Sequence, residues 1–87
     1  MLSWDRIEEF HKYSGETHSN FLKKACSACL NRNKKYFLKR QIDLYVYDSP
    51  RDKGIYSLCA KCNKSFQKRY GPSRKLTAQE VFVFLTL

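Results

Sequence analysis

The sequence predicts a small α+β domain in which helices flank a β-hairpin. Three observations lead to this prediction. Four cysteines form two Cys-x-x-Cys pairs, residues 42–47 alternate in the manner of a strand, and large apolar residues recur at i, i+4 and i+8 from the last cysteine. With 87 residues the chain is long enough for one domain, but its core is small and a stabilising cross-link or metal is expected.

We expect a single domain over 1–87 with three parts. Residues 1–23 are expected to form an N-terminal helix and a connector, residues 24–71 a metal-binding finger with four cysteine ligands, and residues 72–87 a C-terminal helix. No internal repeat extends beyond the two Cys-x-x-Cys pairs.

The N-terminal part predicts a helix over residues 3–13. Ser3 suits the N-cap, and Leu2 with Ile7 would form a hydrophobic staple around it. We expect residues 16–25 to be a connector, with Phe21 and Leu22 anchored in the core. The following metal-binding turn would then leave from this anchor.

The middle of the chain predicts a hairpin. From residue 42 onward one face would carry Ile42, Leu44 and Val46, and the other would carry Asp43, Tyr45 and Tyr47. Residues 48–54 have turn composition, and residues 55–58 would return as a short strand. Residues 32–40 fit a helix as well as a strand, so both alternatives stay open.

Two helices are expected after the hairpin. Cys62, Phe66 and Tyr70 share one helical face, and the Gly71-Pro72 pair ends a helix over residues 60–70. In the last segment, Thr77 and Glu80 form a capping box. Because residues 81–84 read Val-Phe-Val-Phe, a strand there is the alternative to a helix.

The four cysteines are the strongest candidate site. Two residues between thiols allow one turn to aim both sulfurs at a single point, so Cys26 with Cys29 and Cys59 with Cys62 could supply a tetrahedral site for one structural Zn²⁺. The 29 residues between the pairs leave room for the hairpin. Four cysteines could instead form disulfides in three pairings.

Whether the cysteines bind zinc or form disulfides depends on the redox state of the compartment in which the protein resides. The first ten residues lack the apolar run of a secretory signal, and no stretch has transmembrane length. We therefore expect an intracellular protein, in the cytoplasm or nucleus, that is not secreted and not bound to a membrane. Thiols in such a reducing compartment stay available for metal.

The order of a ligand turn, a hairpin and a second ligand pair at a helix start resembles the treble-clef class of zinc fingers, over residues 24–71. The resemblance implies one structural zinc ion held by the four cysteines. Zinc ribbons are the nearest alternative, but a strand usually follows their second pair. Some treble-clef proteins are nucleases with a histidine on the hairpin, whereas His11 and His18 both precede the first pair here. We therefore expect no enzyme, with His18 as a fifth ligand or base as the alternative.

The charge pattern predicts an anionic partner. The formal net charge is +9, from 17 Lys and Arg against 8 Asp and Glu. Four thiolates and Zn²⁺ would together add −2, which leaves about +7. Thirteen of the 17 basic residues lie in residues 23–40 and 61–75, which contain no acid. The cysteines would bring these two segments together.

We expect nucleic acid, DNA or RNA, to be the partner, in a regulatory and non-catalytic role without a small-molecule substrate. The candidate contacts are Lys34, Lys35, Lys39, Arg40, Lys61, Lys64, Lys68, Arg69, Arg74 and Lys75. Tyr36, Tyr45 and Tyr47 could stack on unpaired bases, or could simply pack in the core. The alternative function is a protein adaptor that binds its partner through the apolar terminal helices.

Overall fold

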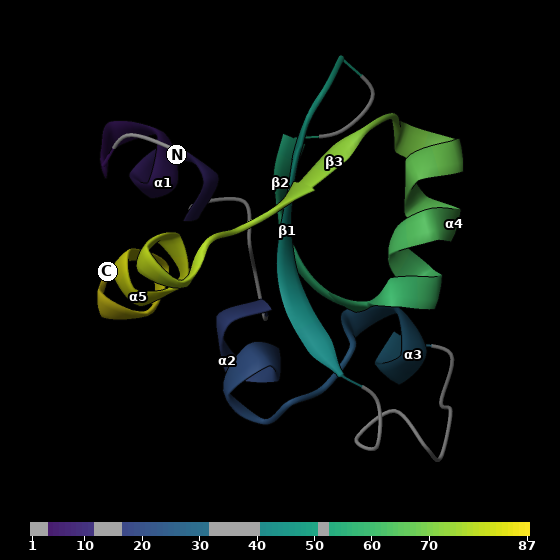
Figure 1. Cartoon of the computed structure of the whole chain (residues 1–87), viewed down its shortest axis with the longest axis horizontal. Helices are drawn as coiled ribbons and strands as arrows, with labels where there is room; N and C mark the ends of the chain where they lie inside the picture. Colours follow the sequence, from purple (N-terminus) through teal and green to yellow (C-terminus); the bar gives the residue numbers. More distant parts are fainter. Residues whose placement is uncertain (1–3, 12–16, 32–40, 51–52) are drawn as a thin grey trace.

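The computed structural model describes residues 4–11, 17–31, 41–50 and 53–87. In chain order, the elements are α1 (Trp4–His11), α2 (Thr17–Leu22), α3 (Ser27–Asn31), β1 (Ile42–Asp48), β2 (Lys53–Cys59), α4 (Ala60–Tyr70), β3 (Ser73–Lys75) and α5 (Ala78–Thr86). The sheet lies between α4 on one face and α1 with α5 on the other (Figure 1). No helix in these ranges has the length and apolar character needed to cross a membrane.

The sheet is antiparallel and has the strand order β2-β1-β3. In the β1–β2 hairpin, Ile42 is paired with Cys59 and Asp48 with Lys53. The hairpin confirms the strand pattern seen in the sequence, with the returning strand longer than the predicted residues 55–58. Because β1 is central and both faces are covered, Leu44 and Val46 enter one core and Tyr47 enters the other. Ile42, predicted on the face of Leu44 and Val46, instead joins the core of Tyr47 at the start of the strand.

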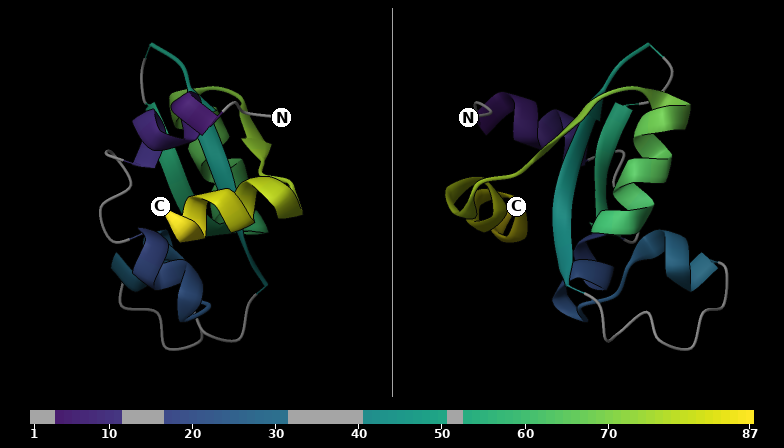
Figure 2. Two further views of the ribbon diagram at one scale, coloured as in Figure 1. Left: turned by 90° about the vertical axis from the view of Figure 1, so that its left-hand side faces the viewer. Right: turned by 45° about the vertical axis from the view of Figure 1, so that its right-hand side comes forward.

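The first core, which we call the sulfur core, lies on the α4 side of the sheet. It consists of Cys26, Ala28, Cys29, Ile42, Tyr47, Leu58, Cys59 and Cys62. The second, which we call the helix core, lies under α1 and α5. It consists of Ile7, Phe10, Leu44, Val46, Ile55, Leu76 and Phe84. Figure 2 shows α5 crossing the outside of the sheet next to α1.

Helix α1 confirms the N-terminal helix. Ile7 and Phe10, three residues apart on one face of this helix, are fully buried. The predicted cap and staple at Leu2 and Ser3 lie outside the described residues.

The connector predicted at residues 16–25 is wrong, because Thr17–Leu22 form α2. This helix ends in a Schellman-type turn: Ala25 N–H bonds the carbonyl of Asn20 at 2.7 Å, and Lys24 N–H bonds that of Phe21 at 3.0 Å. Lys24 takes the left-handed conformation (φ 59°) that glycine usually supplies, which removes the common sequence signal for a helix end.

Phe21 and Leu22, both predicted to be anchored in the core, differ in burial. Phe21 is half-buried and packs against both cores. Leu22 is 61% exposed, so its predicted burial is wrong. Once the segment is a helix, its two adjacent side chains point in directions about 100° apart and cannot both face the sheet.

The C-terminal segment begins with a strand that the sequence did not reveal. β3 pairs with β1, with Lys75 opposite Tyr45, and is only three residues long. Helix α5 then starts at the predicted capping box: Glu80 N–H donates to Thr77 Oγ1 at 3.2 Å, and Thr77 N–H donates to Glu80 Oε1 at 3.0 Å. The predicted helix is therefore confirmed, and the alternative of a strand at residues 81–84 is excluded.

Glu80 also joins α5 to β3. Its side chain is completely buried and accepts two hydrogen bonds from the Arg74 guanidinium, at 2.9 Å and 2.8 Å. This bidentate contact raises the pKa of Arg74. A buried carboxylate needs such a partner, since an unpaired charge in the interior is strongly unfavourable.

Replacing Arg74 with Met should therefore lower the free energy of unfolding of the metal-loaded protein by about 2 kcal/mol. This is below the roughly 3–5 kcal/mol seen for fully buried pairs, because the Arg74 side chain is 45% exposed. Urea unfolding measures the change. The neighbouring Lys75→Met variant is the control, since its 3.6 Å pair with Asp43 is more exposed and should contribute less than about 1 kcal/mol. Equal losses in both variants would contradict this role of Glu80.

Candidate metal centre

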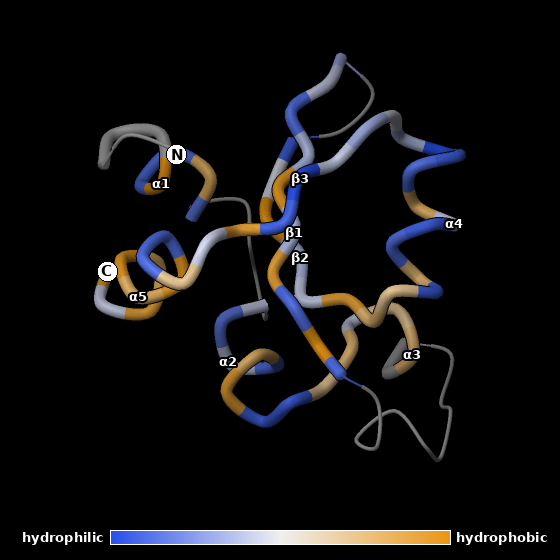
Figure 3. Tube along the Cα trace, in the orientation of Figure 1, coloured by the Kyte–Doolittle hydropathy of each residue, from blue (hydrophilic) through white to orange (hydrophobic). Residues whose placement is uncertain are grey.

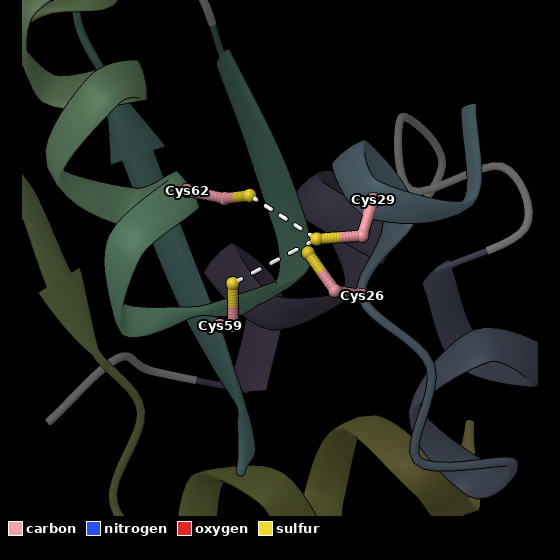
Figure 4. A group of neighbouring side chains, drawn as sticks. All are labelled: Cys26, Cys29, Cys59 and Cys62. Atoms are coloured by element: carbon pink, nitrogen blue, oxygen red, sulfur yellow. Dashed lines mark hydrogen bonds between the residues drawn. The ribbon is translucent and has the colours of Figure 1, made fainter. Parts of the chain in front are cut away.

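Four cysteine sulfurs meet at one point inside the sulfur core. The Sγ atoms of Cys26, Cys29, Cys59 and Cys62 all lie within 4.8 Å of one another, and all four residues are buried. Figure 4 shows the four side chains pointing toward a common centre from the α3 region and from the start of α4. In the described residues this group contains no histidine.

The spacing of the sulfurs suits a tetrahedral metal site. Cys29 Sγ lies 3.6 Å from Cys62 Sγ and 4.0 Å from Cys59 Sγ. Four metal–sulfur bonds of about 2.3 Å require sulfurs about 3.8 Å apart. A disulfide would bring two sulfurs to about 2.05 Å, but all four cysteines are free. The alternative of disulfide pairing therefore does not describe this structure.

Two different local structures supply the ligand pairs. Cys26 directly precedes α3 and Cys29 lies within it, so the first pair sits on a short helix rather than on an open turn. Cys59 ends β2 and is the N-cap residue of α4, while Cys62 lies in the first turn of α4. The positive end of the α4 dipole therefore faces the sulfurs and favours thiolates there.

A buried hydrogen-bond network holds the first pair against the hairpin. Ser57 donates to the carbonyl of Ala25 at 3.0 Å, and its hydroxyl also lies 3.1 Å from that of Ser27. Asn20 Nδ2 donates to Ser27 Oγ at 3.1 Å. These residues come from α2, α3 and β2, so no local sequence signal could have revealed them as supports of the site.

The protonation of the sulfurs depends on their burial and on whether a cation is bound. Burial raises the pKa of the Cys29 thiol, and burial together with the Cys59 and Cys29 sulfurs raises the pKa of the Cys62 thiol. Without a cation, these thiols would stay protonated at neutral pH. A divalent metal reverses this preference, since a coordinated thiol is deprotonated. The donor set and its spacing thus fit a metal ion.

The predicted basic contacts fall into three groups. Lys61, Lys64, Lys68 and Arg69 are exposed on α4. Arg74 is paired with Glu80 and Lys75 with Asp43. The four predicted contacts on the other arm lie outside the described residues: Lys34, Lys35, Lys39 and Arg40.

Of the residues proposed for base stacking or as a fifth ligand, Tyr47 lies inside the core and His18 lies outside the sulfur group. Tyr47 is completely buried and donates to Asn63 Oδ1 at 2.7 Å, so of its two alternatives packing in the core is confirmed and base stacking is excluded. Tyr45 is half-buried, and Tyr36 lies outside the described residues. His18 lies against Phe84 with its Nε2 3.2 Å from the carbonyl oxygen of Leu85, and it does not belong to the sulfur group.

Comparison of this chain with protein families, with curated proteins and with solved structures finds no match. The candidate functions therefore rest on the residues of the site and of α4.

Proposed function

We propose that the four cysteines hold one structural zinc ion and that the chain is a small nucleic-acid-binding protein of the treble-clef type. Four thiolates in tetrahedral spacing are the typical donor set of structural zinc. The order of α3, the β1–β2 hairpin and α4 supports the treble-clef assignment, with a ligand pair at each end of the hairpin. The site differs from that class in one respect, since the first cysteine pair lies at a short helix, α3.

Four protein ligands complete the zinc shell, so we assign the metal a structural and not a catalytic role. Catalytic zinc keeps one coordination position open for water or substrate. The metal instead joins the N-terminal end of α4 to α3, which holds α4 at a defined place on the sheet. Its contribution to function is therefore to present the outer face of α4.

The observation that carries the nucleic-acid proposal is a row of lysines on that face. Lys61, Lys64 and Lys68 recur at i, i+3 and i+7, so they project from one side of α4 at intervals of about 4.5 Å and about 6 Å along its axis. All three are exposed. Figure 3 shows α4 as largely hydrophilic, in contrast to α5 beyond its first turn.

The ion pairs separate these lysines from three other cations. Lys53 pairs with Glu9, Arg74 with Glu80, and Lys75 with Asp43. None of the ion pairs among the described residues involves a lysine of α4. Their charge is therefore available to an external anion, and a row of phosphates is the polyanion that such spacing suits.

The test is a titration of the zinc-loaded protein with short single- and double-stranded DNA and RNA. If each of the three α4 lysines contacts one phosphate, the affinity for a duplex should fall about 40-fold between about 50 and 200 mM salt. The affinity for a single strand should fall about 20-fold over the same range. Fluorescence anisotropy measures both. Absence of binding to every nucleic acid at the lower salt concentration would refute the proposed function.

A protein adaptor is the second candidate, and Phe82 favours it. This residue is 67% exposed on α5, where a large apolar side chain has no evident role in the core. An adaptor would bind its partner with little salt dependence and would lose that binding when Phe82 becomes Ser. Changes to the α4 lysines would leave such a complex intact.

A further inference from the structure

We infer that α4 binds the phosphate backbone without reading the base sequence; this rests on the proposed nucleic-acid function. Base recognition in a groove needs side chains that match the hydrogen-bond pattern of a base edge, whereas phosphate contacts carry no sequence information directly. The outer face of α4 carries side chains that can contact phosphate and few that match a base edge.

The amide side chains of α4 are turned toward the sheet. Asn63 Oδ1 accepts hydrogen bonds from Tyr47 Oη at 2.7 Å and from Ser73 Oγ at 2.7 Å. Gln67 Nε2 donates to Ser73 Oγ at 2.9 Å. Asn and Gln are the usual readers of adenine, and they read it with both the amide oxygen and the amide nitrogen. Each of these two side chains has already committed one of those atoms to the fold.

The exposed side chains on the lysine side of α4 are suited to phosphate. Between this row and Arg69 lies the exposed Ser65, whose hydroxyl can also bond a phosphate oxygen. The helix has no Asp or Glu that could accept from cytosine. A lysine ammonium is a mobile point charge and recognises phosphate without the geometric fork of arginine.

Arg69 is the side chain of α4 whose planar guanidinium is best suited to read guanine in a bidentate manner. It follows Lys68 and therefore projects about 100° away around the helix. Its guanidinium lies 6.0 Å from the centre of the Tyr70 ring in the last turn. The lysine row of α4 can therefore contact a backbone while Arg69 lies to its side.

The experiment compares three labelled duplexes of about 16 base pairs, containing only A·T, only G·C, or mixed pairs, with the zinc-loaded full chain. We expect dissociation constants within about threefold of one another and equal salt slopes. Lys64→Ala should flatten the plot of log affinity against log salt by about 0.9 on every duplex. Lys53→Ala is the control with the same charge change, since Lys53 pairs with Glu9 on α1, and it should leave the slope unchanged.

A preference of about tenfold or more for one duplex would overturn the inference while leaving the proposed function intact. A change in slope on one duplex only, when Lys64 is replaced, would also overturn it. Absence of binding to all three duplexes at low salt would overturn the inference and the proposed function together.

Discussion

Removal of the metal is expected to unfold residues 24–71 and to abolish the cooperative thermal transition. Half of the sulfur core consists of the four cysteines, and the other half packs directly around them. Structural zinc contributes about 10–16 kcal/mol of binding free energy, which reaches or exceeds the whole stability of a typical small domain of about 5–15 kcal/mol. The strands β1 and β2 also supply Leu44, Val46 and Ile55 to the helix core, so the loss should spread to that core.

Far-UV circular dichroism before and after chelation measures this change, and elemental analysis of the purified protein identifies the metal. Cys62→Ser should reproduce the effect, because it removes one ligand from the first turn of α4. Ser65→Ala, an exposed substitution on the same helix, is the matched control and should keep the native transition. A chelated protein that retained its native spectrum and melting temperature would show that the sulfurs do not hold a stabilising metal.

Neutralising Lys64 and Lys68 together is expected to weaken nucleic-acid binding by on the order of 10- to 100-fold at low salt. Each lost phosphate contact removes its counterion release, so the double variant Lys64→Gln plus Lys68→Gln should also reduce the duplex salt slope by about 1.8. The zinc-bound fold should persist, because both side chains are exposed and point away from the sheet. Anisotropy titrations over a series of salt concentrations measure affinity and slope together.

The matched control for this prediction changes the net charge equally on the other side of the sheet. Ala78→Glu plus Gln79→Glu also lowers the charge by two, at exposed positions in the first turn of α5, where acids suit the helix dipole. If the α4 lysines form the interface, this control should bind nearly as well as the wild type. An equal loss of affinity in both double variants would mean that net charge alone governs binding.

The metal site and most of the elements could be predicted because their signals are local. The Cys-x-x-Cys spacing brings each pair of sulfurs together within one turn of chain. The alternation from Ile42 to Tyr47, the stop at Gly71-Pro72 and the box of Thr77 and Glu80 each act over a few residues. Such signals survive in the folded protein because the tertiary contacts agree with them.

The errors arose where a local signal was missing or where distant segments decide the outcome. Lys24 replaces the usual glycine at the end of α2, so the helix carried no stop signal. Tyr47 alternates correctly along β1 but is buried, since α4 covers the face that the pattern left open. The three residues of β3 form a strand only because β1 offers its free edge.

By itself, the sequence determined the four cysteines of the candidate metal site, the hairpin between them, the helix that follows and the strong positive charge. Only the tertiary structure decided which of those charges remain available. It pairs Arg74 with a buried carboxylate, pairs Lys75 with Asp43, and leaves the lysine row of α4 facing outward. The physical reason is that ligand spacing is encoded within one turn of chain. The partners of a charge or an amide depend on which segments the fold brings within a few ångströms of it.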